Sequence, residues 1–358
     1  MKDGLDRLKN HEKVLLARRF QNELFFVLGF VFDLFTLGRI DDGLNLISQF
    51  IYLFLSSFIV IYLGTQLQIR IVEKVGPYLN EALHFFLGSL LSAYSIFYFK
   101  SSSLSNSLIF MLVIVAFLFL NETKMAKERG PLFKSFLLAL CTLSFLNYLF
   151  PVIIGSTGFF IFLLSSLICL GIGFGLSTLV KKYSDESNLS KNFFKSWASL
   201  IVIFNIFYLL KIIPPVPLAI KEIGIFYNID KDEKSYILKE RDGLFNFLTF
   251  GETTFTYIEN DKIYVFLRIF APSGFQETVY TKWQTQVNGD WTTSDKIPLT
   301  VKGGRDEGFR GYAYKSNYTE GQWRILIETS DGLEIGRTYF STKKAPTDEE
   351  RQWHLIER

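Results

Sequence analysis

Residues 132–154 read LFKSFLLALCTLSFLNYLFPVII, and residues 158–180 read GFFIFLLSSLICLGIGFGLSTLV. These two stretches contain one charged residue, Lys134. A helix needs about 20 mostly apolar residues, at about 1.5 Å each, to cross the hydrocarbon core of a bilayer. Because only Gly155-Ser156-Thr157-Gly158 joins the stretches, we expect a tight hairpin of two membrane-spanning helices.

The apolar composition extends over the first 217 residues and stops there. Residues 1–217 hold 28 of the 38 Phe residues, with 19 Lys and Arg against 13 Asp and Glu. Residues 218–358 carry 19 Lys and Arg against 22 Asp and Glu. The contrast excludes a single soluble globular domain, and no segment is basic enough to indicate nucleic acid as a partner.

Seven stretches qualify, or nearly qualify, as membrane spans. They cover residues 22–38, 47–66, 82–99, 104–120, 132–154, 158–180 and 194–213. The first is the weakest, because its apolar core is short and contains Asp33. The last should end at Pro214-Pro215-Val216-Pro217, since proline cannot continue a helix. We therefore expect a polytopic helical membrane bundle over residues 22–217, after a basic cytoplasmic segment at residues 1–21.

The positive charges between these stretches predict their orientation. With the N-terminus in the cytoplasm, 16 of the 19 Lys and Arg residues of 1–217 fall on the cytoplasmic side, and only Arg39, Lys100 and Lys211 fall on the other. Such an excess is the pattern of the positive-inside rule. Seven spans then place residues 218–358 outside the cytoplasm. If the first stretch lay on the membrane surface instead, this parity would reverse.

After Leu218 the apolar pattern changes from long runs to an alternation with a period of two, which is typical of strands. Three such rows cover residues 263–270, 279–287 and 323–327. Asn288-Gly289 and Asp331-Gly332 are hairpin signals, because these residue types tolerate the positive φ of a tight turn. We expect an antiparallel all-β sandwich domain over residues 218–345. A charged tail should follow over residues 346–358, with a short helix from Pro346.

Charged side chains within hydrocarbon are costly and therefore mark candidate sites. Asp33 lies inside the first stretch, and Arg39, Asp41 and Asp42 follow at its outer edge. One interpretation is a proton-linked or ion-binding carboxylate at Asp33. The other, which we favour, is an Asp that fixes helix packing through a polar group on a neighbouring helix.

A stripe of small residues and two mid-span amides favour helix packing rather than ligand binding. Gly171, Gly173 and Gly175 lie mid-helix with no strand before them, so they are not a nucleotide-binding fingerprint. They predict close approach of a neighbouring helix. Asn147 and Asn205 are expected to form hydrogen bonds between helices.

The strand-rich half offers Trp and Arg side chains that stack on sugar rings and form paired hydrogen bonds with carboxylates or phosphates. Trp283 and Trp323 are in phase with the apolar rows, so we expect both in the core. The candidate binding surface consists of Trp291, Arg305, Arg310 and Arg324. The pair Gly303-Gly304 offers N–H groups to an anion in one interpretation, and a turn or bulge in the one we favour.

Short motifs follow one another along this half: Trp283, Trp291, Ile297-Pro298-Leu299-Thr300-Val301, Gly304-Arg305, Gly308-Phe309-Arg310, Gly321-Gln322-Trp323-Arg324, Thr329-Ser330-Asp331-Gly332, Ile335-Gly336 and Phe340. Over residues 263–342 this series resembles the bacterial envelope family called domain of unknown function 2914. The resemblance implies a bacterial multi-pass membrane protein with a C-terminal β-domain, and no activity. With the charge pattern, it indicates the bacterial inner (cytoplasmic) membrane and a periplasmic C-terminal domain.

Two functions remain open. The first is a non-enzymatic protein, anchored in the lipid bilayer, whose extracytoplasmic β-domain binds an envelope protein, a glycan or a lipid head group. The alternative is a membrane carrier or intramembrane enzyme that uses Asp33 near the outer leaflet. No Ser/His/Asp set, paired carboxylates or zinc spacing stands out. We therefore expect no catalytic, cofactor-binding or metal-binding residues, and favour the non-enzymatic function.

Overall fold

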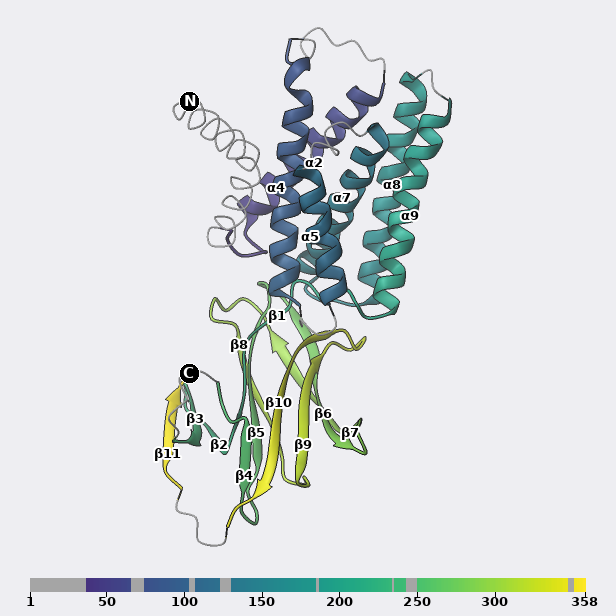
Figure 1. The fold of residues 1–358 in the computed structure, drawn as a ribbon. Coiled ribbons are helices and arrows are strands. Elements are labelled where there is room, and N and C mark those ends of the chain that lie inside the picture. The colour runs from purple at the N-terminus through teal and green to yellow at the C-terminus, as the bar shows by residue number, and fades with distance from the viewer. Residues whose placement is uncertain are drawn as a thin grey trace, which may run out of the picture. The chain divides into compact units, whose positions relative to one another are not determined.

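The computed structural model describes residues 37–65, 74–102, 107–122, 130–184, 187–233, 235–242, 250–346 and 351–358. Within these ranges, six α-helices precede eleven strands (Figure 1). A 3-10 turn, η1 (Gly76–Tyr78), leads into the second of the helices. The helices are α2 (Gly43–Gly64), α4 (Leu79–Lys100), α5 (Leu108–Glu122), α7 (Pro131–Ile154), α8 (Phe159–Tyr183) and α9 (Ser187–Leu209).

Five of these helices, α2, α4, α7, α8 and α9, are long and apolar enough to cross a membrane. The sixth, α5, is apolar but has only 15 residues. The described residues do not support the expected count of seven spans. Six of the seven expected stretches contain a helix, and the first, residues 22–38 with Asp33, lies outside the described residues. The helical, membrane-type character of the first half is confirmed.

Helix α9 ends at Leu209, before the proline cluster that was expected to stop it. Lys211 adopts a left-handed φ of 58°. Its N–H donates to the carbonyl of Tyr208, and the N–H of Ile212 donates to the carbonyl of Phe207. These two bonds form a Schellman motif, which closes the helix without proline. Glycine usually occupies the left-handed position, so a lysine there carries no sequence signal.

The chain divides into two compact units. Met1–Ile96, Val113–Thr142 and Ile172–Ala198 form the first unit. Phe97–Leu112, Leu143–Gly171 and Ser199–Arg358 form the second unit, which therefore combines one end of several helices with all of the strands.

In the first unit, Trp197 of α9 is the centre of helix packing. Its ring is fully buried, and its indole N–H donates to the hydroxyl of Ser135 at 3.0 Å. A Cβ added at Gly173 would lie 2.6 Å from this ring. The same addition at Gly171 or Gly175 would meet nothing within 4 Å. The predicted close approach is therefore present, but it depends on the middle glycine of the stripe alone.

The strands of the second unit form three sheets. The five-stranded sheet has the order β4-β10-β9-β6-β7, and the two three-stranded sheets have the orders β1-β5-β8 and β11-β3-β2. The strands are β1 (Ala219–Phe226), β2 (Asn228–Lys231), β3 (Tyr236–Arg241), β4 (Thr254–Tyr257), β5 (Ile263–Phe270), β6 (Gln276–Val287), β7 (Asp290–Lys302), β8 (Phe309–Lys315), β9 (Gly321–Glu328), β10 (Glu334–Lys344) and β11 (Trp353–Glu357).

Two hydrophobic cores hold these sheets in three layers. Alternate residues of β5, among them Val265 and Leu267, point into the larger core, which they share with Trp283 and Trp323 of the five-stranded sheet. The opposite face of β5 contributes Phe266 to a smaller core with the β11-β3-β2 sheet. The sheet β1-β5-β8 is thus the middle layer. Both tryptophans expected in the core are buried there.

The third layer departs from the expected single sandwich. Trp353–Glu357, which we expected in a charged tail, forms strand β11 and pairs antiparallel with β3 (Figure 1). Arg351 anchors this return, because its guanidinium lies 2.7 Å from Asp261 and its side chain is 7% exposed. The many charges of the tail obscured the short apolar pattern around Leu355 and Ile356. A second departure is that β4 pairs parallel, not antiparallel, with β10.

The two expected hairpins differ in detail. At Asn288-Gly289 both residues have positive φ, 52° and 91°, as the tight turn between β6 and β7 requires. At Asp331-Gly332 only the glycine does. There the connection is longer, closed by a bond from the Thr329 N–H to the carbonyl of Leu333. The Asp331 carboxylate in this turn accepts hydrogen bonds from Phe159 of α8 and Tyr208 of α9.

Candidate functional site

A surface pocket of about 600 Å³ lies where the β2–β3 turn meets β8. Its volume is within the range typical of small-molecule sites. The side chains that line it combine positive charge with aromatic rings. They are Lys231, Asp232, Glu233, Tyr236, Leu299, Arg305, Phe309, Arg310 and Tyr312, with Gly311. We call it the basic–aromatic pocket.

The two arginines of this pocket lie on different backbone elements, one in a strand and one in a turn. Arg310 is in β8, and its guanidinium lies 5.6 Å from the ring centre of Tyr236. Arg305 is in the connection before β8, in a turn closed by the N–H of Gly308 donating to its carbonyl at 3.0 Å. Gly308 has a φ of 93°, which favours glycine. Both cations therefore stand on ordered backbone, as a preformed site requires.

The adjacent glycine pair is a turn and not an anion site. The N–H of Gly303 donates to the carbonyl of Phe275, and that of Gly304 to the carbonyl of Ala271. A Cβ added at Gly303 would lie 1.8 Å from the carbonyl oxygen of Pro272. Close backbone approach explains this glycine, and neither N–H points at a ligand.

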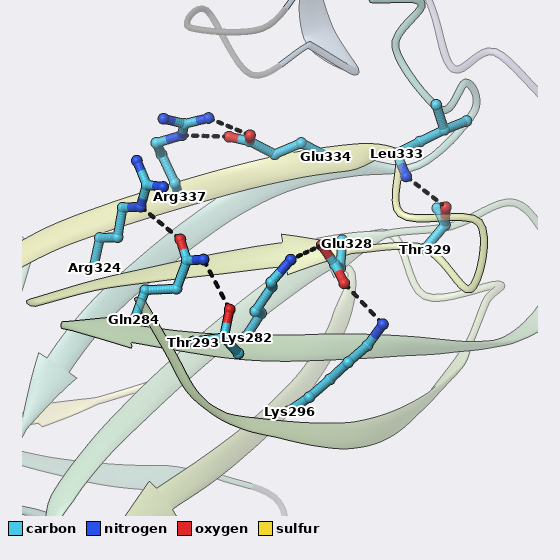
Figure 2. Close-up of polar contacts among 10 residues, drawn as sticks. All are labelled: Lys282, Gln284, Thr293, Lys296, Arg324, Glu328, Thr329, Leu333, Glu334 and Arg337. Carbon is cyan, nitrogen blue, oxygen red and sulfur yellow. Dashed lines mark hydrogen bonds and ion pairs between the residues drawn. The ribbon is translucent and has the colours of Figure 1, made fainter. Parts of the chain in front are cut away.

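Trp291 and Arg324 lie together on the outer face of the five-stranded sheet, away from the pocket residues. The guanidinium of Arg324 is 4.4 Å from the ring centre of Trp291. Figure 2 shows Arg324 donating to Gln284, which donates in turn to Thr293, at 2.7 and 3.0 Å. The row crosses β9, β6 and β7. Because Arg324 covers one face of the indole, that face does not accept a sugar ring.

The rest of this face pairs its own charges. Arg337 bonds to Glu334 through two nitrogens, as drawn in Figure 2. Glu328, 8% exposed, lies between Lys282 and Lys296, at 3.5 and 2.8 Å. Hydrogen bonding from Arg337 lowers the pKa of Tyr339, which lies beside Trp291. On the outer face the side chains of this row thus bond to one another across the sheet, whereas in the pocket three cations line one cavity with two carboxylates.

The four residues of the predicted binding surface thus divide into two pairs. The structure brings Arg305 and Arg310 together in the pocket, and Trp291 and Arg324 together on the outer face. Sequence reasoning missed Lys231, Tyr236 and Tyr312. Lys231 and Tyr236 come from the β2–β3 hairpin, whose Tyr236 packs against Phe266 of β5 and Tyr312 of β8, far along the chain.

The predicted intramembrane polar set is described only in part. Arg39 and Asp41 form a two-bond ion pair, with nitrogen–oxygen distances of 2.9 and 2.7 Å. Asp42 precedes the first residue of α2 and makes no side-chain cap bond. Asp33 lies outside the described residues. Among the residues that are described, no group of three His, Cys, Asp or Glu side chains gathers as a metal site.

Two carboxylates that were not among the predicted site residues connect the β-domain to the start of α8 and the residues before it, within the second unit. Glu277 of β6 accepts from the N–H and the hydroxyl of Thr157, at 2.8 and 2.7 Å. Asp331 accepts from the N–H of Phe159 at 2.6 Å and from the hydroxyl of Tyr208 at 2.9 Å. Phe159 is the first residue of α8, so its N-terminal cap comes from another element. No local pattern reveals a cap 172 residues away.

The fold and these sites define a protein with several membrane-type helices and a C-terminal strand-rich domain. Residues 276–342 match the model of the family described as Protein of unknown function (DUF2914). The chain therefore carries a DUF2914 domain, and the resemblance seen in its motifs is confirmed. The matched segment includes Trp291, Arg305, Arg310 and Arg324 as well as both carboxylates.

Other comparisons are remote. No curated protein matches the sequence. A structure of beta-glucosidase from Listeria innocua in complex with gluconolactone has 9% identity and a TM-score of 0.19, covering 32% of this chain and 17% of that one. A structure of Pseudomonas fluorescens alkylpurine DNA glycosylase AlkC bound to DNA containing an abasic site analog has 11% identity and a TM-score of 0.21. It covers 82% of this chain and 77% of that one. Likenesses this weak support no conclusion on fold or function.

Proposed function

We propose that this chain is a non-enzymatic, multi-pass protein of the bacterial inner membrane. Its β-domain, outside the cytoplasm, binds a sugar that bears a carboxylate or a phosphate. The observation that carries the proposal is the basic–aromatic pocket, in which Lys231, Arg305 and Arg310 lie beside Tyr236, Phe309 and Tyr312. The five helices of spanning length and the excess of basic residues on one side support the membrane location and orientation.

The chemistry of the pocket favours an acidic sugar over a neutral one. Arginine offers paired N–H donors that match the geometry of carboxylate and phosphate. Aromatic rings present flat apolar faces that pack against sugar rings. Asp232 and Glu233 only partly offset the three cations, and the Asp232 carboxylate already accepts the N–H of Glu233 at 2.7 Å. An anion therefore gains attraction here that a neutral sugar lacks.

The test is calorimetric titration of the full-length chain in nanodiscs of neutral lipid with oligogalacturonate, glucose 1-phosphate and maltotriose. We expect binding of the first two and not of maltotriose. Replacing Arg305 or Arg310 by Gln should weaken binding about 10–100-fold, because a charge-assisted hydrogen bond contributes about 1.5–3 kcal/mol. Arg324→Gln removes the same charge from the outer face and is the matched control.

Vesicles that contain phosphatidylglycerol distinguish the two sources of such an anion. If a lipid head group is the ligand, the β-domain should bind to these vesicles. This binding should depend on Arg305, and the soluble sugars should compete with it. If maltotriose binds as well as oligogalacturonate, or Arg324→Gln weakens binding as much as Arg310→Gln, the proposed pocket is not the site.

A further inference from the structure

The contacts between the α7–α8 connection and the β-domain are close and polar, and two carboxylates take part in them. The N–H of Gln276 donates to the carbonyl of Gly155 at 2.9 Å. A Cβ added at Gly155, whose φ is 79°, would lie 2.7 Å from the carbonyl oxygen of Gly274. Backbone therefore lies directly against backbone at this place. Beside it, Glu277 and Asp331 accept hydrogen bonds from four donors: the N–H and the hydroxyl of Thr157, the N–H of Phe159 and the hydroxyl of Tyr208.

The two carboxylates satisfy donors that would otherwise be left open. The first N–H groups of a helix have no partner within the helix, and an anion there is stabilised by the helix dipole. Asp331 supplies such an anion to α8 through the N–H of Phe159. Glu277 serves Thr157, two residues earlier, and is itself 8% exposed. Two negative charges thus converge on one short segment.

We propose that Glu277 and Asp331 form an acid-tightened joint, in which the two carboxylates hold the β-domain on the α7–α8 connection and a proton taken up by Glu277 strengthens that hold. This joint involves no residue of the basic–aromatic pocket, so it stands or falls independently of the proposed ligand.

The direction of the pH effect follows from the surroundings of Glu277. Burial raises the pKa of its carboxyl, the Thr157 hydrogen bonds lower it by less, and the charge of Asp331 raises it further. The docked form therefore holds a proton more tightly than an exposed Glu does. By linkage, docking is fully favoured below the ordinary Glu pKa and weakens as pH rises through the raised value.

The other polar groups at the joint do not oppose this direction. The Tyr208 hydroxyl donates to Asp331 at 2.9 Å. The Lys211 ammonium lies beside Gly332, where an added Cβ would be 2.5 Å from its nitrogen. Glu277 is buried and Asp331 is exposed, so Glu277 is the carboxyl whose surroundings depend on docking.

Hydrogen–deuterium exchange on the full-length chain in nanodiscs tests the joint directly. The readout is the protection of the peptide spanning residues 155–162, with each rate divided by the intrinsic exchange rate at the same pH. We expect wild-type protection to rise severalfold between about pH 8 and about pH 5. Glu277→Gln, which resembles the protonated form, should be protected at every pH. In Glu277→Ala the protection of this peptide should fall about tenfold or more.

Glu307→Gln, an exposed carboxylate next to Arg268, is the matched control and should leave both protection and its pH dependence unchanged. Tryptophan emission confirms that each variant keeps a folded β-domain, and the wild-type pH series requires no variant. Protection of the wild-type chain that stays constant or falls toward low pH contradicts the proposal. So does unchanged protection in Glu277→Ala.

Discussion

Replacing Trp283 by Ala is expected to lower the free energy of unfolding by about 3–5 kcal/mol, the usual cost of removing a large aromatic ring from a packed core. Trp283 is fully buried in β6, and its ring meets Phe340 edge to face, with ring centres 6.4 Å apart. Because Trp283 belongs to the core shared by two sheets, Ala leaves a cavity among buried side chains.

A smaller substitution separates ring packing from hydrogen bonding. The buried indole N–H of Trp283 has no hydrogen-bond partner, whereas that of Trp323 donates to the carbonyl of Thr319 at 2.9 Å. Trp283→Phe therefore removes an unsatisfied donor, and Trp323→Phe removes a bond that contributes about 1 kcal/mol. We expect Trp323→Phe to be the more destabilising of the two.

Guanidinium titration of the detergent-solubilised chain, followed by the fluorescence of the remaining tryptophans, measures both effects. A loss of less than about 1 kcal/mol in the free energy of unfolding of Trp283→Ala would contradict a central place for this residue in the core.

Asp295→Ala is expected to cost about 2–3 kcal/mol, because it leaves a buried ammonium without its counter-ion. The Lys315 side chain is 1% exposed and pairs with Asp295, with Ser294 and Asn317 as further acceptors at 3.0 Å. The pair joins β8 of the middle layer to β7 of the five-stranded sheet. The estimate is below the ~3–5 kcal/mol of fully buried pairs, since Asp295 is 35% exposed.

The double variant Asp295→Ala/Lys315→Met removes the stranded charge and should recover at least half of the loss, because apolar replacement of a buried ion pair is often neutral. The same denaturant titration measures it. Hydrogen bonding from Lys315 lowers the pKa of Asp295, so the pair's contribution should be lost as pH falls through that lowered value. A double variant less stable than Asp295→Ala alone would contradict this account.

Periodicity predicted most of the fold because it is a direct consequence of burial. The row Ile263–Phe270 became β5, which is buried on both faces in the middle of three layers. Long apolar runs became α2, α4, α7, α8 and α9 for the same reason. The third layer was not predictable, since β11 is stabilised by Arg351 and by pairing with β3, not by a hydrophobic row of its own.

The sequence predicted which residue types form the candidate site, but not which of the predicted residues lie together. Arg305 and Arg310 lie close in sequence and share the pocket, whereas Arg324 is directed to the opposite side of the sandwich by the alternation of β9. Glu277 continues the buried row of β6 formed by Val279, Thr281 and Trp283, so a carboxylate in that phase was a signal that periodicity alone does not interpret. It is buried, and Thr157 of the α7–α8 connection donates to its carboxylate.

The central claim is that the basic–aromatic pocket binds acidic sugars outside the cytoplasm. Membrane vesicles of known orientation and labelled oligogalacturonate test it most directly. Right-side-out vesicles that carry the wild-type chain should bind the label, and inside-out vesicles should bind it only after permeabilisation. The variant Arg305→Gln/Arg310→Gln should bind it in neither. Binding by intact inside-out vesicles alone, or undiminished binding by the double variant, would contradict the account.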